Sequence, residues 1–255
     1  MSIGTSSFVE AIDRRVSCRA FEDTPLSADQ VDMLRAAARE SSADSGLLFE
    51  LHVPHEDGSS LALSNKVFAG HPGAYVTCVG PNDPISLEKI GYFGQIVVLI
   101  ATSLGLGSCW VAGTFDREKT TCAVPDGMML HDVIPIGAPM HQTPFRQRSI
   151  RRAIRSKSKR PSKLYAGPTT LEEAPQWIWE GVHAIWKGPS AANRQPVVLA
   201  QDTYGAPVRA MLPRRRHDVE YTDLGIAKLQ FKVAATASGA HGTWDWGVDG
   251  TYNLD

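Results

Sequence analysis

The sequence is poor in cysteine, in long apolar runs and in net charge. Its 255 residues include four cysteines, which form no C-x-x-C pair and lack the density of a disulfide scaffold. We therefore expect free thiols and a reducing, cytoplasmic location. The formal net charge of −1 argues against a general polyanion binder.

No stretch of the sequence has the length and composition expected of a membrane span. Residues 1–15 contain no apolar core of the kind found in signal peptides, and we expect no signal peptide. The longest apolar run, Ile96 to Leu106, includes Thr102 and Ser103 and is too short to cross a bilayer. This run predicts a buried helix, and no membrane partner is expected.

The most distinctive segment that is present is Arg14-Arg15-Val16-Ser17-Cys18-Arg19. It follows Phe8, Val9 and Ile12, whose spacing suits one face of a helix. Arginine forms planar, bidentate hydrogen bonds with phosphate, and serine adds a donor, so the segment can hold a phosphate group. It can equally be a solvated helix end, where arginine complements the helix dipole. The segment alone leaves both interpretations open.

Capping and turn signals predict alternating helices and strands. Ser27 and Gln30 form a capping box, which predicts a helix starting at Ala28. Gly105 and Gly107 suit the end of a long preceding helix. The first half is predicted to contain helices over 28–40 and 86–104 and strands over 47–53, 74–79, 109–111 and 131–137.

The second half repeats this plan. A shift of 134 residues pairs Gly91 with Gly225, Ala101 with Ala235, Gly105 with Gly239 and Trp110 with Trp244. A shift of 149 residues pairs 41–44 with 190–193, the helix from Ala28 with 172–187 and the strand from Leu47 with 197–200. We therefore predict an N-terminal half at 1–145, a basic linker at 146–168 and a C-terminal half at 169–255, together forming one compact unit.

The two halves differ in the residues that carry chemistry. The second half has no counterpart of Arg15-x-Ser17-x-Arg19, and the first half lacks the chemistry of Pro189 and Asn193. A pseudo-symmetric body would then contain one complete site, built from complementary parts of both halves.

Four motifs occur in order along the chain. They are Arg15-x-Ser17-x-Arg19-x-Phe21, Gly91–Leu99 leading to Leu104–Trp110, Ile134–Pro139 followed by a basic tract, and Gly188–Pro196. Together they resemble the FMN-dependent nitroreductase family, most closely a branch in which one chain carries two half-size units. The resemblance implies an α+β fold with a mixed central sheet flanked by helices. It also implies that the halves form an intramolecular pseudo-dimer with the flavin at the seam.

The resemblance also implies roles for individual residues. Arg15 and Ser17 would hold the FMN phosphate, with Arg14 in support, and Arg19 would face the pyrimidine side of the ring. A positive charge there stabilises negative charge on the ring. The backbone of Ala112 and Gly113 would face flavin N5, and no side chain is expected to be a catalytic nucleophile. Further cofactor contacts are expected from Lys157, Lys159 and Arg160, at the phosphate, and from Pro189, Ser190 and Asn193, at the ring and ribityl chain.

The activity that the resemblance implies is ping-pong reduction of a small, electron-poor acceptor, a nitroaromatic or quinone, with NAD(P)H as the transient hydride donor. Two alternatives stay open. One is a flavin-dependent oxidase or dehydrogenase of a biosynthetic intermediate, and the other is a non-enzymatic binder of flavin or nucleic acid. The basic tracts at 146–160 and 214–217 favour nucleic acid, but no aromatic stacking platform accompanies them. A monomer or a weak homodimer is expected.

Two further clusters are set aside. His52 and His55 lie close together, but no Cys or acidic residue has metal-site spacing with them, so no metal is expected. Cys109 lies in an apolar segment, which predicts an inert, buried thiol rather than a nucleophile.

Overall fold

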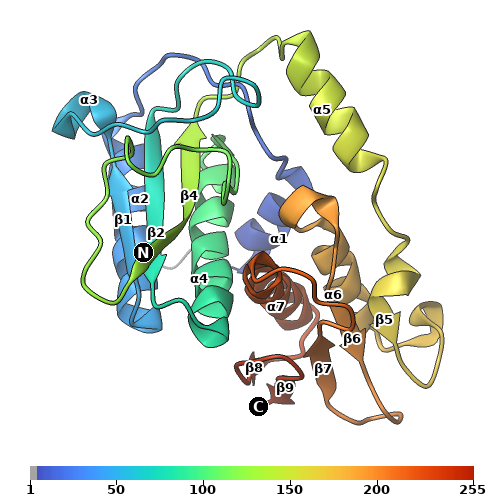
Figure 1. The fold of residues 1–255 in the computed structure, drawn as a ribbon. Helices are drawn as coiled ribbons and strands as arrows, with labels where there is room; N and C mark the ends of the chain where they lie inside the picture. Colours follow the sequence, from blue (N-terminus) through green and yellow to red (C-terminus); the bar gives the residue numbers. More distant parts are fainter. Residues whose placement is uncertain (1–4) are drawn as a thin grey trace. The chain divides into compact units, whose positions relative to one another are not determined.

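The computed structural model describes residues 5–255 and divides into two compact units (Figure 1). Unit 1 contains the chain up to Asp13, Asp83–Gln95 and Lys157–Asp255, and unit 2 contains Arg14–Asn82 and Ile96–Ser156. Each unit is therefore assembled from segments that are distant in sequence. The sequence-based boundaries at 145 and 168 stay a prediction.

Unit 2 contains an antiparallel sheet with the strand order β1-β2-β4-β3. The strands are β1 (Leu48–His52), β2 (Ala74–Gly80), β3 (Gly107–Ser108) and β4 (Met129–Gly137). The helices are α2 (Ala28–Ser45), the short α3 (Pro54–Asp57) and α5 (Phe145–Arg155). All seven residues of β2 are buried, so this strand lies in the core of the unit.

Helix α2 begins where the capping box predicts. The Ser27 hydroxyl accepts from Gln30 N and the Gln30 side chain accepts from Ser27 N. The helix continues past the predicted end at Glu40 to Ser45, and Gly46 closes it with a φ of 73°. Glycine suits this left-handed position because it has no Cβ.

Unit 1 contains a five-stranded sheet with the order β5-β6-β7-β9-β8. Its strands are β5 (Tyr165–Ala166), β6 (Val198–Ala200), β7 (Val208–Met211), β8 (Gly242–Trp244) and β9 (Thr251–Leu254). Its helices are α1 (Thr5–Arg14), which belongs to this unit up to Asp13, α6 (Gln176–Lys187) and α7 (Val219–Ala237). It also contains three short 3₁₀ helices, η1 (Pro161–Leu164), η2 (Leu171–Glu173) and η3 (Ala191–Asn193). The sheet is mixed because β5 runs parallel to β6 while its other pairs are antiparallel.

An aromatic core holds α6 and α7 on this sheet. Phe231 of α7 makes edge contacts with Trp177, Trp244 and Tyr252. Gly181 of α6 lies so close to the Phe231 ring that a Cβ atom would overlap it. Trp177 is therefore a packing residue, as its helical setting predicts.

Helix α4 (Pro84–Ser103) contributes to both units, with residues up to Gln95 in unit 1 and the rest in unit 2. Among the described helices it is the one long and apolar enough to cross a membrane by length and composition, but 78% of its apolar window is buried. Core helices pass the same test of length and composition. The predicted buried helix is confirmed.

The predicted internal repeat is confirmed by the topology. The order helix, strand, strand, helix, strand, strand occurs as α2-β1-β2-α4-β3-β4 and again as α6-β6-β7-α7-β8-β9. The sheet orders β1-β2-β4-β3 and β6-β7-β9-β8 are the same. Gly105 and Gly239, paired by the shift of 134 residues, follow equivalent helices with φ values of 76° and 86°. The α+β class is confirmed as well.

One strand prediction differs from the structure. The strand expected at 109–111 is the shorter β3 at Gly107–Ser108, and Val111 makes a single bridge to Val133. The expected linker at 146–168 includes most of α5, followed by η1 and β5. Gln147, Ile150, Arg151 and Ile154 in this stretch have helical spacing.

Candidate functional site

A cleft of about 290 Å³ lies within unit 2, in the region where the sequence predicts phosphate binding. We call it the arginine cleft, and its polar lining includes Arg14, Arg15, Ser17, Arg19, Gln147 and Arg151. Its volume is close to the lower end of the range for small-molecule pockets, which begins at about 300 Å³. Four positive charges and a hydroxyl thus share one cavity.

The backbone after α1 is fixed in an extended path that presents these side chains. Cys18 N donates to Ser108 O at 2.8 Å, and Phe21 N donates to Ala69 O at 2.9 Å. Side chains alternate along an extended chain, so the Arg-x-Ser-x-Arg spacing places Arg15, Ser17 and Arg19 on one side.

Gly107 and Phe21 hold this segment against the sheet. A Cβ atom on Gly107 would lie 2.6 Å from Cys18 Cβ, so glycine is required for the close approach. The Phe21 side chain is fully buried in the core of unit 2. The arginines are therefore carried by a rigid backbone rather than by a free loop.

The electrostatics of the cleft favour an anion. The pKa of Arg15 is lowered to about 10, mainly by burial, with Arg19 and Arg151 adding to the effect and Cys109 opposing it. Arg15 is still charged at neutral pH, and its Nη1 lies 3.5 Å from Ser17 Oγ. Across residues 5–255, no carboxylate forms an ion pair with Arg19 or Arg151. A bound anion would relieve this repulsion between positive charges.

Gln147 adds an acceptor to the cleft. Its side chain is 6% exposed, and its Oε1 has no hydrogen-bond partner in the described part of the chain. Leaving a buried acceptor unpaired costs about 1–3 kcal/mol. A ligand with an N–H or O–H group would satisfy it. Sequence reasoning missed Gln147 and Arg151, although their spacing of four residues places both on one face of a helix.

The other predicted cofactor contacts come together in unit 1. Gln195 links them through two hydrogen bonds of 2.7 Å. Its side-chain Oε1 accepts from Lys159 N, and its main-chain carbonyl oxygen accepts from Lys159 Nζ. Asn193 Nδ2 donates to Ser158 Oγ at 2.9 Å, and Ser190 Oγ accepts from Gln195 N at 3.0 Å. The segment around Lys159 and the loop from Pro189 to Asn193 therefore lie side by side. Sequence reasoning did not single out Gln195.

This loop is strained. Ala192, Asn193 and Gln195 have φ values of 50°, 54° and 47°, in the left-handed region that favours glycine. Each such residue costs on the order of 1–3 kcal/mol and persists when its surroundings impose it. Gln195, which is 4% exposed, supplies that restraint through its bonds to Lys159 and to Trp186 O.

The remaining predicted residues are more exposed. Lys157 and Arg160 lie on the surface beside Lys159. Burial lowers the pKa of Lys159, and the charge of Arg214 adds to this effect while Glu220 opposes it. Ala112 and Gly113 follow β3 outside the lining of the arginine cleft, and Ala112 O accepts from Arg117 Nη2 at 2.8 Å. Their predicted approach to flavin N5 stays a prediction, as does the joint site of Arg15 and Asn193.

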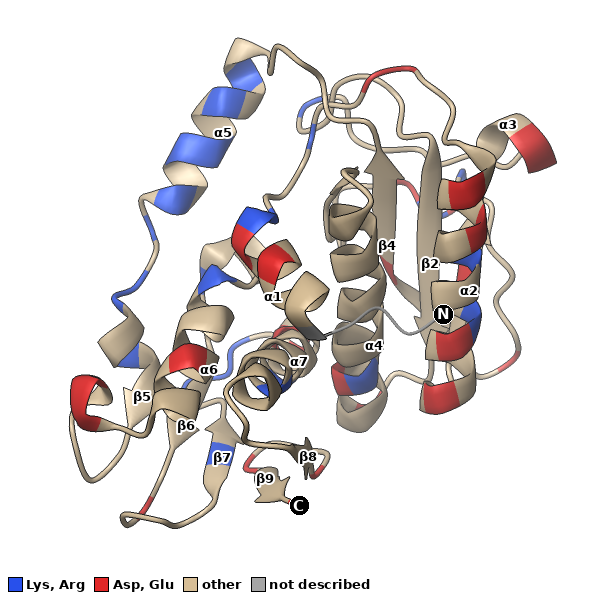
Figure 2. Ribbon diagram, turned by 180° about the vertical axis from the view of Figure 1, so that it is seen from behind, with Lys and Arg blue, Asp and Glu red and all other residues tan. Residues whose placement is uncertain are grey.

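Figure 2 shows in blue the Lys and Arg positions along the ribbon of α5, which carries no acidic residue. Arg148, Arg151, Arg152 and Arg155 line a surface groove of about 460 Å³ that also includes Ser156. We call it the α5 groove. Arg151 lines both this groove and the arginine cleft, so the two adjoin at this residue.

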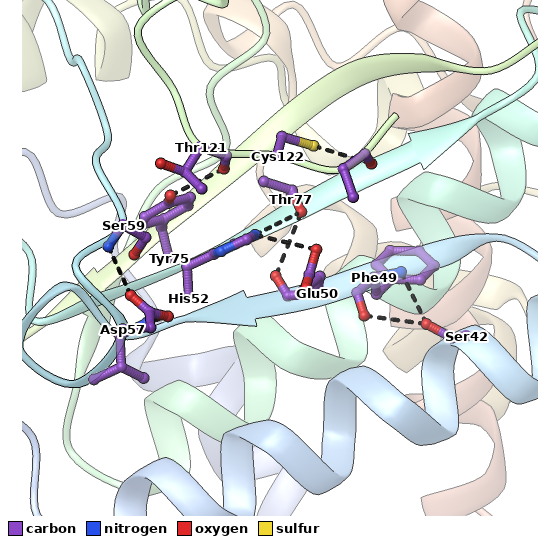
Figure 3. A network of polar contacts seen from close by, with 12 residues as sticks. Ser42, Phe49, Glu50, His52, Asp57, Ser59, Tyr75, Thr77, Thr121 and Cys122 are labelled. Atoms are coloured by element: carbon purple, nitrogen blue, oxygen red, sulfur yellow. Dashed lines mark hydrogen bonds and ion pairs between the residues drawn. The ribbon is translucent and has the colours of Figure 1, made fainter. Parts of the chain in front are cut away.

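A separate polar network lies on β1 and β2 (Figure 3). His52 stacks on Tyr75 with ring centroids 4.7 Å apart, and its Nε2 lies 3.3 Å from Thr77 Oγ1. Tyr75 OH donates to Ser60 O and Thr121 O. These contacts pair His52 and Tyr75 with neighbouring groups, and we assign the network a structural role.

The cysteines behave as the composition predicts. Cys18, Cys78, Cys109 and Cys122 are free thiols. Cys109 is buried, and burial raises the pKa of its thiol, so the reactive thiolate is disfavoured.

Three solved structures are similar to this chain or to part of it. A "putative nitroreductase" from Thermotoga maritima is 21% identical with a TM-score of 0.60, covering 100% of this chain and 95% of that one. A nitroreductase family protein from Clostridium novyi is 22% identical with a TM-score of 0.41, and the match covers 52% of this chain and 86% of that one. A nitroreductase with bound FMN from Bacteroides fragilis is 17% identical with a TM-score of 0.42, and the match covers 54% of this chain and 91% of that one. The Thermotoga structure shares the fold of the whole chain.

The sequence itself matches one family model. Residues 7–235 fit the family described as "Putative TM nitroreductase". A search of curated proteins finds no match. Because the family model covers most of the chain and the fold agrees along its length, this protein belongs to that nitroreductase family.

Proposed function

We propose that the protein is an FMN-dependent oxidoreductase that uses NAD(P)H to reduce a small, electron-poor acceptor such as a nitroaromatic or a quinone. The observation that carries the proposal is the arginine cleft, in which positive charges and the unpaired acceptor of Gln147 share one cavity. Membership of the nitroreductase family supports it. So does the fact that a family relative in Bacteroides fragilis binds FMN.

The residues of the cleft suit the groups that FMN presents. Arg15, Ser17 and Arg151 would hold the phosphate, because arginine and serine donate several hydrogen bonds to phosphate oxygens. Arg19 would place a positive charge near the ring. Gln147 Oε1 would accept from an N–H or O–H group of the cofactor.

The strained loop of unit 1 would supply the remaining contacts. Its restraint by Gln195 means that Pro189, Ser190 and Asn193 are ordered before any ligand arrives. Preordered contacts bind more tightly because little conformational entropy is lost on binding. Lys157, Lys159 and Arg160 would add positive charge near the phosphate.

When bound, FMN supplies the redox chemistry by taking a hydride from NAD(P)H and delivering electrons to the acceptor. The protein would bind and orient the cofactor, and the backbone of Ala112 and Gly113 would approach N5. We propose that donor and acceptor use one pocket in turn, which gives ping-pong kinetics, and that the enzyme works in the cytoplasm as a monomer or weak homodimer.

Cofactor titration tests the first part of the proposal. Purified protein should take up FMN with quenching of flavin fluorescence, and the double variant Arg15→Ala with Ser17→Ala should lose that uptake. Arg146→Ala is the matched control, because Arg146 contacts Asn65 O and lies outside the cleft. A protein that binds no FMN, or a double variant that binds it as well as the wild type, would contradict the proposal.

Steady-state kinetics test the second part. NADPH or NADH with a nitroaromatic or a quinone, in the absence of oxygen, should give turnover with parallel double-reciprocal plots. Oxygen consumption on added metabolites, without turnover of these acceptors, would instead identify an oxidase.

A further inference from the structure

Helix α5 carries four arginines on one stripe. Arg148, Arg151, Arg152 and Arg155 stand at positions i, i+3, i+4 and i+7 and all are exposed. Like charges at these spacings destabilise a helix, and across residues 5–255 no carboxylate forms an ion pair with any of the four. The stripe is electrostatically unfavourable by itself and becomes favourable when an anion binds.

The stripe lines the α5 groove, which adjoins the arginine cleft at Arg151. Gln147 belongs to the same helix and lines the arginine cleft. One helix therefore lines two adjoining arginine-rich sites. The inner one is the place proposed for the FMN phosphate, and the outer one has no assigned ligand.

We propose that the α5 groove binds the adenosine 2′-phosphate of NADPH and that the protein thereby selects NADPH over NADH. This inference rests on the proposed function, which already requires a nicotinamide donor near the arginine cleft. A monoester phosphate carries nearly two negative charges at neutral pH, whereas NADH has a neutral hydroxyl at the same position. Arginines without acidic partners discriminate strongly between these two groups.

The dimensions of the groove favour a small ligand over a nucleic acid. A stripe of this spacing spans roughly 10 Å along a helix, at about 1.5 Å per residue. A duplex gains affinity by contacting many phosphates along its length. The groove volume of about 460 Å³ falls instead in the range of small-molecule pockets.

The helix also lacks the second face that a membrane requires. Ile150 and Ile154 are half-buried against the protein. The large apolar side chain of α5 that is mainly exposed is Phe145 in the first turn, at 78%. Interfacial helices insert a continuous apolar face into the bilayer. Beyond Phe145, the large exposed side chains of α5 are charged.

Nucleotide binding tests the inference independently of flavin. Isothermal titration calorimetry should show that 2′,5′-ADP binds at least about tenfold more tightly than 5′-AMP, since the extra phosphate adds charge-assisted hydrogen bonds. Arg152→Ala should remove most of this preference. Arg146→Ala removes the same charge from the same helix outside the groove, and it should leave the preference intact.

Kinetics of the FMN-loaded enzyme provide the second measurement. Arg152→Ala should raise the KM for NADPH about tenfold and leave the KM for NADH unchanged. Equal binding of 2′,5′-ADP and 5′-AMP would overturn the inference. It would also be overturned if Arg152→Ala weakened binding of a short DNA duplex or of phosphatidylserine vesicles without changing nucleotide preference.

The two proposals fail separately. If the protein binds no FMN but prefers 2′,5′-ADP through Arg152, the flavin assignment is wrong and the 2′-phosphate site stands. If the protein binds FMN but treats the two nucleotides alike, the flavin assignment stands and the 2′-phosphate site is wrong.

Discussion

Gly91 of α4 and Gly225 of α7 lie at the contact of their two helices, and each is packed against the backbone of the other helix. A Cβ atom on Gly91 would overlap Thr222 O, and one on Gly225 would overlap Glu88 O. Each glycine thus meets the residue three positions before the other glycine. The contact has the near two-fold symmetry expected of a repeat with a shift of 134 residues.

We predict that Gly225→Ala destabilises the protein by about 1–3 kcal/mol, because the added methyl group meets backbone that cannot move aside. Urea denaturation measures the change in the free energy of unfolding. Gly113→Ala is the matched control, since a Cβ atom there meets nothing within 4 Å and its effect should stay within about 0.5 kcal/mol. Equal stability of the two variants would show that the helices separate easily.

A second prediction concerns the ion pair between Glu88 and Lys228, which are both fully buried with Nζ and Oε1 2.5 Å apart. Lys228 Nζ also donates to Asp245 O and Gly247 O, and Gly247 N donates to Glu88 Oε2. Lys228→Met should cost about 3–5 kcal/mol, because it leaves a carboxylate buried without its partner.

The double variant, Lys228→Met with Glu88→Gln, tests the physical cause of that loss. It should be less destabilised than the sum of the two single variants, since the charge left behind by one change is removed by the other. Urea denaturation of all three variants gives the coupling energy. Strictly additive losses would mean that the pair does not interact as the 2.5 Å distance indicates.

A third prediction is a dependence of stability on pH that arises from His52. Burial lowers the pKa of His52 below its ordinary value of 6.5. The negative charges of Glu50 and Asp57 raise this pKa but offset only part of the effect of burial. The unfolded chain therefore takes up this proton first as the pH falls. The contribution of His52 is fully present above pH 6.5 and is lost between that value and the lower folded pKa.

Denaturation at several pH values below 7 measures this effect. His52→Gln should flatten the decline in stability below pH 6.5 that His52 causes in the wild type. His55→Gln, the same substitution at an exposed position on α3, is the control. An unchanged decline in the His52 variant would assign the acid sensitivity to other groups.

A fourth prediction separates ligand binding from stability at Gln147. Gln147→Leu removes a buried acceptor that has no partner, so the protein without cofactor should gain up to about 1 kcal/mol in stability. The same change should weaken FMN binding about tenfold, since the ligand loses one hydrogen bond in a dry cleft. Thermal melting and fluorescence titration measure the two effects. A variant that loses stability would show that Gln147 serves the fold instead.

Several features of this protein could be predicted from sequence because neighbouring residues determine them. The capping box of Ser27 and Gln30 starts α2 as expected, and the glycines at 105 and 239 end equivalent helices. The repeat could be found because both copies keep the same element order. The Arg-x-Ser-x-Arg spacing needs only the period of an extended chain to place three side chains together.

Other features were decided by the tertiary structure, because the partners are distant in sequence. Gln147 and Arg151 were hidden in a tract that composition alone describes as basic and solvated, and only the packing of α5 in unit 2 places them in the arginine cleft. Gln195 restrains the strained loop through Lys159, which is 36 residues away. Local sequence sets which conformations a segment can adopt, whereas burial and hydrogen bonding between remote segments select the one that forms the site.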